Sequence, residues 1–375
     1  MRSINRVLSI FLFAYAATNS FAQSVSSFPP PDAILVDTKH KEPKSGVQVG
    51  PGNTITIQQG VGTPTTINVL TFSKDGKLLA AGKDFGRVVV WDVPNRKFLC
   101  AVNTGQGIVH AVALSPDGQL MATGGEGDRQ DLKLWHLPDG KLVRTYNCFH
   151  GYVLTAAFGP SSTWLVVSEN IGSTHVLDVR TGQQILEMKE MNEPLLSPDG
   201  TMLMTASETD LAIWSTSDWK QQRALPRSPR YAVPLALDPQ NDRFVIVRSD
   251  FFRLVRLSTG ESFPNSPMTT LPKFNAAAGG FAAFATDTPI VFGHSDGRLW
   301  AWDSSTGRTC VSDVMYSESG SLSPDGTVLA GAKDSSILAP ARSGDGVWLW
   351  DVNRLAAKCG LAHLNSDDPL SPREE

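Results

Sequence analysis

The sequence predicts an all-β fold, a single domain built from seven small antiparallel sheets. A turn motif, Ser-Pro-Asp-Gly or the related Ser-Lys-Asp-Gly, recurs at 73–76, 115–118, 197–200 and 323–326. A short alternating apolar segment, usually ending in tryptophan, recurs at Trp91, Trp135, Leu177, Trp214, Val255, Trp302 and Trp350. These intervals lie close to the ~40 to 45 residues of a four-stranded blade, so the repeat predicts a seven-bladed β-propeller.

Each repeat divides into four expected strands. Pro and Asp set the first bend of the turn, and Gly takes its positive φ. A small apolar segment follows, such as 78–82 or 120–124, and then the alternating segment, such as 87–93. Strands this short, with turns about every ten residues, exclude helices. Turns such as Asp139-Gly140 lead into a fourth strand, which can be polar because it is half solvated.

These residues resemble the WD-repeat family of β-propellers over roughly residues 54–352. The matching features are Ser-Pro-Asp-Gly after the first strand, Trp-Asp ending the third, and an Asp before the third, at Asp84 and Asp296. The family's Gly-His dipeptide is missing almost everywhere. His150 is the nearest candidate, but its blade carries Leu177 in place of tryptophan, so blade three, like blade five, is degenerate. The resemblance implies an interaction module.

A ring of sheets needs closure, because an open end would expose an apolar face and unpaired strand edges. We expect an N-terminal strand, Thr54–Ile57, to complete the last blade, so that the propeller spans 54–364 and deletion of 54–59 destabilises it. The alternative places 356–364 in that position. Residues 23–53 are expected to be a linker and 365–375 a polar tail.

The first 22 residues resemble a secretory signal. Arg2 and Arg6 precede an apolar run from Val7 to Ala17, and Ser20-Phe21-Ala22 offers small residues at a cleavage site. The run falls short of the ~20 residues needed to span a bilayer, so we expect cleavage after Ala22 and no stable membrane insertion. The alternative is an uncleaved anchor. We therefore expect a periplasmic or extracellular protein.

The four cysteines are expected to remain free thiols, although an exported protein meets an oxidising compartment. Cys100, Cys310 and Cys359 each follow their blade's tryptophan by a similar interval, which predicts equivalent outer positions on different blades. Equivalent outer positions diverge around a ring, whereas a disulfide needs Cα atoms within about 7 Å. Cys148 has no partner in this pattern.

Enzymatic motifs are missing from the sequence, so we expect no catalysis, no cofactor and no metal. No P-loop, dinucleotide fingerprint, H-E-x-x-H, C-x-x-C or G-x-S-x-G occurs. His110, His136, His150 and His175 fall at different points of the repeat, which favours structural or surface roles. The rival is a hydrolase or quinoprotein-like dehydrogenase, which would gather three or more carboxylates, His or Arg at the channel mouth. A third possibility is a structural cell-envelope protein.

Binding is expected on the top face, where loops from second to third strand and from fourth to next first strand meet. The formal net charge of −4 gives no general attraction to nucleic acid. The stretch 219–231 is basic without an acid, 265–278 is long, and 333–345 interrupts blade seven. The candidate contact residues are Arg227, Arg230, Phe251, Ile337, Leu338 and Arg342. They suit a protein or acidic glycan bound by a monomer, and the alternative is solvated loops with incidental charge.

Overall fold

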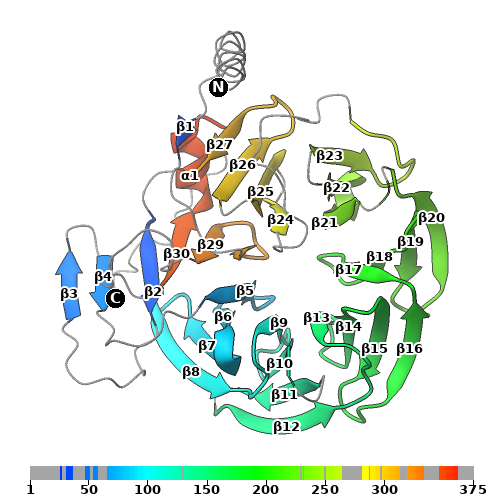
Figure 1. Ribbon diagram of the computed structural model, residues 1–375. Coiled ribbons are helices and arrows are strands. Elements are labelled where there is room, and N and C mark those ends of the chain that lie inside the picture. Colours follow the sequence, from blue (N-terminus) through cyan, green and yellow to red (C-terminus); the bar gives the residue numbers. More distant parts are fainter. Residues whose placement is uncertain are drawn as a thin grey trace, which may run out of the picture.

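The architecture is seen in a computed structural model. It describes residues 26–27, 31–36, 47–50, 54–57, 66–127, 131–137, 139–228, 230, 232–248, 251–263, 281–286, 288–295, 298–312, 319–332 and 346–361. Antiparallel sheets follow one another in chain order around a ring, with the first strand of each sheet innermost (Figure 1). The predicted seven-bladed all-β propeller is confirmed. The expected signal at 1–22 and tail at 365–375 lie outside the described residues.

Blades one to four each contain four strands in sequence order. Blade one consists of β5 (Ile67–Phe72), β6 (Leu78–Lys83), β7 (Arg87–Asp92) and β8 (Lys97–Asn103). Blade two consists of β9 (Val109–Leu114), β10 (Leu120–Gly125), β11 (Leu132–His136) and β12 (Lys141–Tyr146). Blade three consists of β13 (Val153–Phe158), β14 (Trp164–Glu169), β15 (Ser173–Asp178) and β16 (Gln184–Lys189). Blade four consists of β17 (Asn192–Leu196), β18 (Met202–Ala206), β19 (Asp210–Ser215) and β20 (Gln221–Pro226).

Blades five to seven depart from this pattern at their outer edges. Blade five has β21 (Val233–Asp238), β22 (Arg243–Arg248) and β23 (Phe251–Arg256), followed by a single bridge between Val255 and Ser262. Blade six has β24 (Phe281–Phe284), β25 (Ile290–Ser295), β26 (Arg298–Asp303) and β27 (Thr309–Val311), and β1 (Ser26–Ser27) adds to β27 in parallel. Blade seven has β28 (Gly320–Leu322), β29 (Val328–Ala332) and β30 (Gly346–Asp351).

The repeated turn owes its shape to a serine–aspartate pair. Ser73 Oγ donates to Asp75 Oδ1 at 2.6 Å, and Gly76 follows with φ +71°. The other three copies repeat this bond, at Ser115–Asp117 (2.5 Å), Ser197–Asp199 (2.6 Å) and Ser323–Asp325 (2.5 Å). An L-residue is strained at this φ, so glycine ends each turn.

The hydrophobic core lies between neighbouring blades. Trp91, Trp302 and Trp350 are almost completely buried, as expected for repeat residues. Leu177 replaces tryptophan in blade three and is buried as well, in a cluster with residues of blade two. Blade three therefore keeps its four strands, because the apolar alternation survives the loss of the tryptophan.

The predicted position of the closing strand, Thr54–Ile57, is wrong. β2 (Ala33–Val36) pairs with β30 as the outer strand of blade seven, while β4 (Thr54–Ile57) pairs with β3 (Val47–Gly50) in a hairpin beside the ring (Figure 1). An N-terminal strand does close the ring, but it comes from the expected linker 23–53. Ala33 and Leu35 are buried in the cluster that joins blades seven and one, which explains the preference for this segment.

The alternative closure by 356–364 is also not seen. Residues Val352–Lys358 form the helix α1, capped by Asp351, whose Oδ1 accepts from Arg354 N at 2.7 Å. Leu355 and Ala356 are buried against blade six. Among the residues that the structure describes, no helix is long and apolar enough to cross a membrane.

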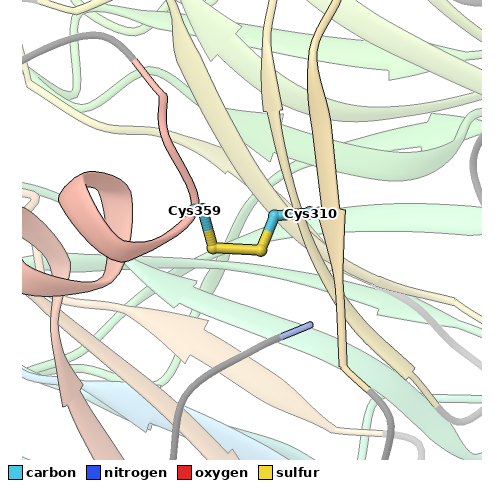
Figure 2. Close-up of a disulfide and its surroundings, with 2 residues drawn as sticks. All are labelled: Cys310 and Cys359. Atoms are coloured by element: carbon cyan, nitrogen blue, oxygen red, sulfur yellow. A yellow bond between two sulfur atoms is a disulfide. The ribbon is translucent and has the colours of Figure 1, made fainter. Parts of the chain in front are cut away.

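The expectation of four free thiols is wrong. Cys310 and Cys359 form a disulfide, with their Cα atoms 5.8 Å apart (Figure 2). Helix α1 is the physical reason, since it turns the chain back from blade seven to β27 of blade six. Cys359 therefore does not occupy the outer-strand position from which divergence was inferred. Cys100 and Cys148 take no part in this disulfide.

Candidate functional site

The predicted contact residues do not assemble into one described surface. Arg227 has a side chain only 5% exposed, and its guanidinium binds Glu193 Oε2 at 2.6 Å, Ser207 O at 2.5 Å and Ala232 O at 2.7 Å. It holds the loop after β20 in place, so the prediction that it is an exposed contact is wrong. Burial raises the pKa of Glu193, and the Arg227 guanidinium partly offsets this effect.

Arg230 is exposed, as predicted, at 59%, and it pairs with Glu208 at 3.2 Å. Phe251 opens β23, but its side chain lies outside the described residues. Ile337, Leu338 and Arg342 also lie outside them. The binding role of these five residues stays a prediction.

The top face nevertheless carries two exposed apolar side chains, Phe85 and Ile171, over blades one to three. Strands alternate in direction within a blade, so turns after the second strand and loops after the fourth reach the same face. On this face lie Phe85, His110, Glu126, Tyr152 and Ile171, a set that we call the upper band.

Phe85 is the most unusual member of the upper band. It occupies the turn Asp84–Gly86 between β6 and β7, and its side chain is 70% exposed. Its backbone is left-handed, with φ 60° and ψ 25°. A large aromatic residue is strained in that region and gains nothing from exposure to water. Neither the strained backbone nor the exposure of this side chain stabilises the fold.

The turn beneath Phe85 is fixed by neighbouring backbone. Asp84 accepts hydrogen bonds from Thr66 N at 3.1 Å and Asn68 Nδ2 at 2.9 Å. Gly86 N donates to Gly107 O, in the loop that leads into blade two. That loop touches the next turn, since a Cβ on Gly107 would lie 2.1 Å from Glu126 O. The turn that carries Phe85 is thus joined to the loop that leads into blade two. Asp296, the other family-type Asp, lies outside the described residues.

The centre of the upper band is polar and aromatic. His110 Nε2 lies 2.9 Å from Glu126 Oε1, and both side chains are partly exposed. The His110 ring also packs against Tyr152, with ring centroids 5.5 Å apart and a 31° angle between planes. This contact links the first strand of blade two to the start of blade three.

Ile171 ends the upper band at 59% exposure. It lies over Gly151, whose Cβ, if present, would be 3.1 Å from Ile171 Cγ2. Below it, Glu169 accepts from His150 N at 2.7 Å, Gly151 N at 2.8 Å and His175 Nε2 at 3.0 Å. Burial raises the pKa of Glu169, but these hydrogen bonds outweigh that effect and lower it below its usual value. Glu169 therefore stays charged and fixes the loop beneath Ile171.

A buried hydrogen-bond network in blade two was not predicted from the sequence. Gln106 Oε1 accepts from Thr123 Oγ1 at 2.7 Å, and Gln106 Nε2 donates to Asp131 Oδ1 at 2.9 Å. Trp135 Nε1 donates to Thr123 Oγ1 at 2.9 Å. Gln106 thus lies before the first strand of its blade, at the position where the family's Gly-His dipeptide was expected. The sequence contained the pattern, because Gln106 follows a glycine shortly before the first strand, and Asp131 lies before the tryptophan.

The described part of the channel mouth carries carboxylates from three blades. Asp199, Asp238 and Asp325 line it, which meets the number expected for a propeller enzyme. Each carboxylate is instead bound within its own blade, to Ser197 and Thr201, to Asn241 and Arg243, and to Ser323 and Thr327. Within the described residues, no group of three His, Cys, Asp or Glu could hold a metal ion.

The repeat and the seven-bladed ring together define a WD-repeat β-propeller. A family model, WD domain, G-beta repeat, matches residues 97–136, which run from β8 to β11. The match supports the resemblance to this class of repeat proteins that the sequence indicated.

Curated relatives match over part of their length. WD repeat and SOCS box-containing protein 1 of Danio rerio is 34% identical over 95 residues, 25% of this chain and 22% of the relative. U3 small nucleolar RNA-associated protein 15 homolog of Xenopus tropicalis is 26% identical over 148 residues, 38% and 28% of the two chains. Eukaryotic translation initiation factor 3 subunit I of Aspergillus niger is 27% identical over 160 residues, 41% and 45%. The match thus spans less than half of each relative.

Proposed function

We propose that this protein is an exported WD-repeat scaffold that binds a protein partner through the upper band and carries out no bond-making chemistry. The observation that carries the proposal is Phe85, 70% exposed on a left-handed backbone. Aromatic residues surrounded by weaker contacts are typical binding anchors. Ile171 supplies a second apolar anchor at the other end of the band.

The relatives support the scaffold role. One is named as a subunit of a translation initiation factor and another as associated with a small nucleolar RNA, so related repeats occur in proteins named for assemblies. These partners are not carried over to this chain. The upper band instead favours a protein with an apolar pocket for Phe85.

Replacing Phe85 should test the proposal. Affinity capture with the mature protein identifies a partner, and its affinity is then measured by titration. We expect Phe85→Ala to weaken binding by about 30-fold, as loss of an anchor worth about 2 kcal/mol implies. Ile185→Ala is the matched control, because Ile185 is 47% exposed but lies on the outer strand β16.

The folded state should tolerate these changes. Phe85→Gly should leave the free energy of unfolding equal or higher, because glycine adopts this φ without strain. If both Phe85 variants bind as tightly as the wild type, the partner uses another surface, and the role of the upper band is wrong.

Export is supported by two features of the chain. The apolar run and the small residues before Gln23 have the form of a cleaved signal. The Cys310–Cys359 disulfide also fits an oxidising compartment, since disulfides are rare where thiols are kept reduced.

The expected mature N-terminus is Gln23. Mass spectrometry of the protein recovered from the exported fraction should show a chain beginning at this residue, because Ala22 closes the cleavage site. A secreted or periplasmic chain that still carries Met1, or a chain found only inside the cell, would contradict the export proposal.

A further inference from the structure

The propeller has a cavity on the face opposite the upper band, which we call the lower cavity. Its volume is about 830 Å³, within the ~300 to 1,000 Å³ typical of small-molecule sites. All seven blades line it, where the first strands end and the repeated turns begin. Pro116, Pro198 and Pro324 of those turns mark its mouth.

The interior of the lower cavity is apolar. The last apolar residue of each first strand contributes to the lining, namely Phe72, Leu114, Phe158, Leu196, Leu237, Phe284 and Leu322. Thr71, Ala157 and Ala283 are half-buried and short, so they leave space in the centre. An apolar group can therefore enter and be shielded from water.

The mouth carries more negative than positive charge. Asp199, Asp238 and Asp325 line it, and Lys74 is the single cation among the described lining residues. Arg243 compensates Asp238, since its Nε lies 2.8 Å from Oδ2.

Asp199 keeps its charge at neutral pH. Its partners among the described residues are neutral: Ser197 Oγ at 2.6 Å, Thr201 N at 3.0 Å and Thr201 Oγ1 at 2.9 Å. Burial raises the pKa of Asp199, but these hydrogen bonds outweigh that effect and lower it.

From this geometry we propose that the lower cavity binds a small amphipathic organic cation, its apolar body within the ring and its ammonium group beside Asp199. A neutral ligand would gain no electrostatic attraction from the carboxylates at the mouth. An anion would be repelled by the carboxylates at the mouth. This site is independent of the upper band, so either can fail without the other.

Three probes of one shape test the proposal: 4-phenylbutylammonium, 4-phenylbutanol and 4-phenylbutyrate, titrated calorimetrically into the mature protein. The ammonium compound should bind tightest and the carboxylate weakest. Asp199→Asn should weaken ammonium binding about two- to fivefold, the range for a solvent-exposed ion pair, and leave the alcohol unchanged. Asparagine keeps the acceptor oxygen that the turn requires.

Asp117→Asn is the matched control. Asp117 accepts from Ser115 and Gln119 in the equivalent turn of blade two, but it does not line the cavity. It should leave all three affinities unchanged. Ala157→Trp should abolish binding by filling the cavity, with Ala283→Trp as the second variant if the first does not fold. No binding of the ammonium compound, an equal or higher affinity for the carboxylate, or binding that survives a folded tryptophan variant would overturn the proposal.

Discussion

Deleting residues 31–36 should destabilise the propeller by several kcal/mol. This segment contains β2, whose Leu35 and Ala33 are buried between blades seven and one. Loss of a buried leucine alone costs about 2 to 5 kcal/mol, and the deletion also exposes the edge of β30. Asp32 adds further contacts, since its Oδ2 accepts from Asp351 N at 2.8 Å and its Oδ1 binds Arg354. Urea unfolding followed by tryptophan fluorescence measures the loss.

The matched control is deletion of residues 54–57. These residues form β4, which pairs with β3 rather than with a blade. Their removal should cost far less than removal of 31–36, and Leu35→Ala should reproduce a large part of the 31–36 effect. Equal destabilisation by both deletions would show that the hairpin supports the ring as strongly as β2 does, and would contradict the closure described above.

The blades were predictable because their signals are local. Ser115, Asp117 and Gly118 define a turn by contacts within four residues, and the alternating segments mark strands wherever the turn occurs. Degeneracy at Leu177 did not matter, since an aliphatic residue fills the same buried position.

The closure and the disulfide depended on long-range contacts. Two short β-prone segments could close the ring, Thr54–Ile57 and Ala33–Val36. Packing against blade seven decides that the second of them does so. A local signal for α1 was present but overlooked: Asp351 is a good N-cap, followed by the helix formers Leu355 and Ala356. Recognising that helix would have removed the argument against a bond at Cys359.

The site was harder to predict than the fold. Phe85 carries no sequence signal for its left-handed backbone, and its exposure follows only from the ring geometry. Arg227 looked like a surface cation, because the sequence does not show that Glu193 and two carbonyl groups surround it.

Breaking the Cys310–Cys359 disulfide should also cost several kcal/mol. The two residues are 49 positions apart and both are buried. For a loop of that length, the chain-entropy model assigns about 4 kcal/mol to the restriction of the unfolded chain. For a domain of this size, such a loss lowers the melting temperature on the order of 10 °C. Thermal unfolding of wild type and of the Cys310→Ser/Cys359→Ser variant measures the difference.

Two further measurements separate loss of the bond from loss of packing. Reductant should lower the melting temperature of the wild type but not that of the double variant, whereas Cys148→Ser, at an exposed cysteine, should remain as sensitive to reductant as the wild type. Thiol titration of denatured, unreduced protein purified from its natural source should return two thiols, rising to four after reduction, because Cys310 and Cys359 are joined. Four thiols without reductant would mean that the bond does not form there. Of the described contacts, β2 and the buried face of α1 would then hold blade seven against its neighbours.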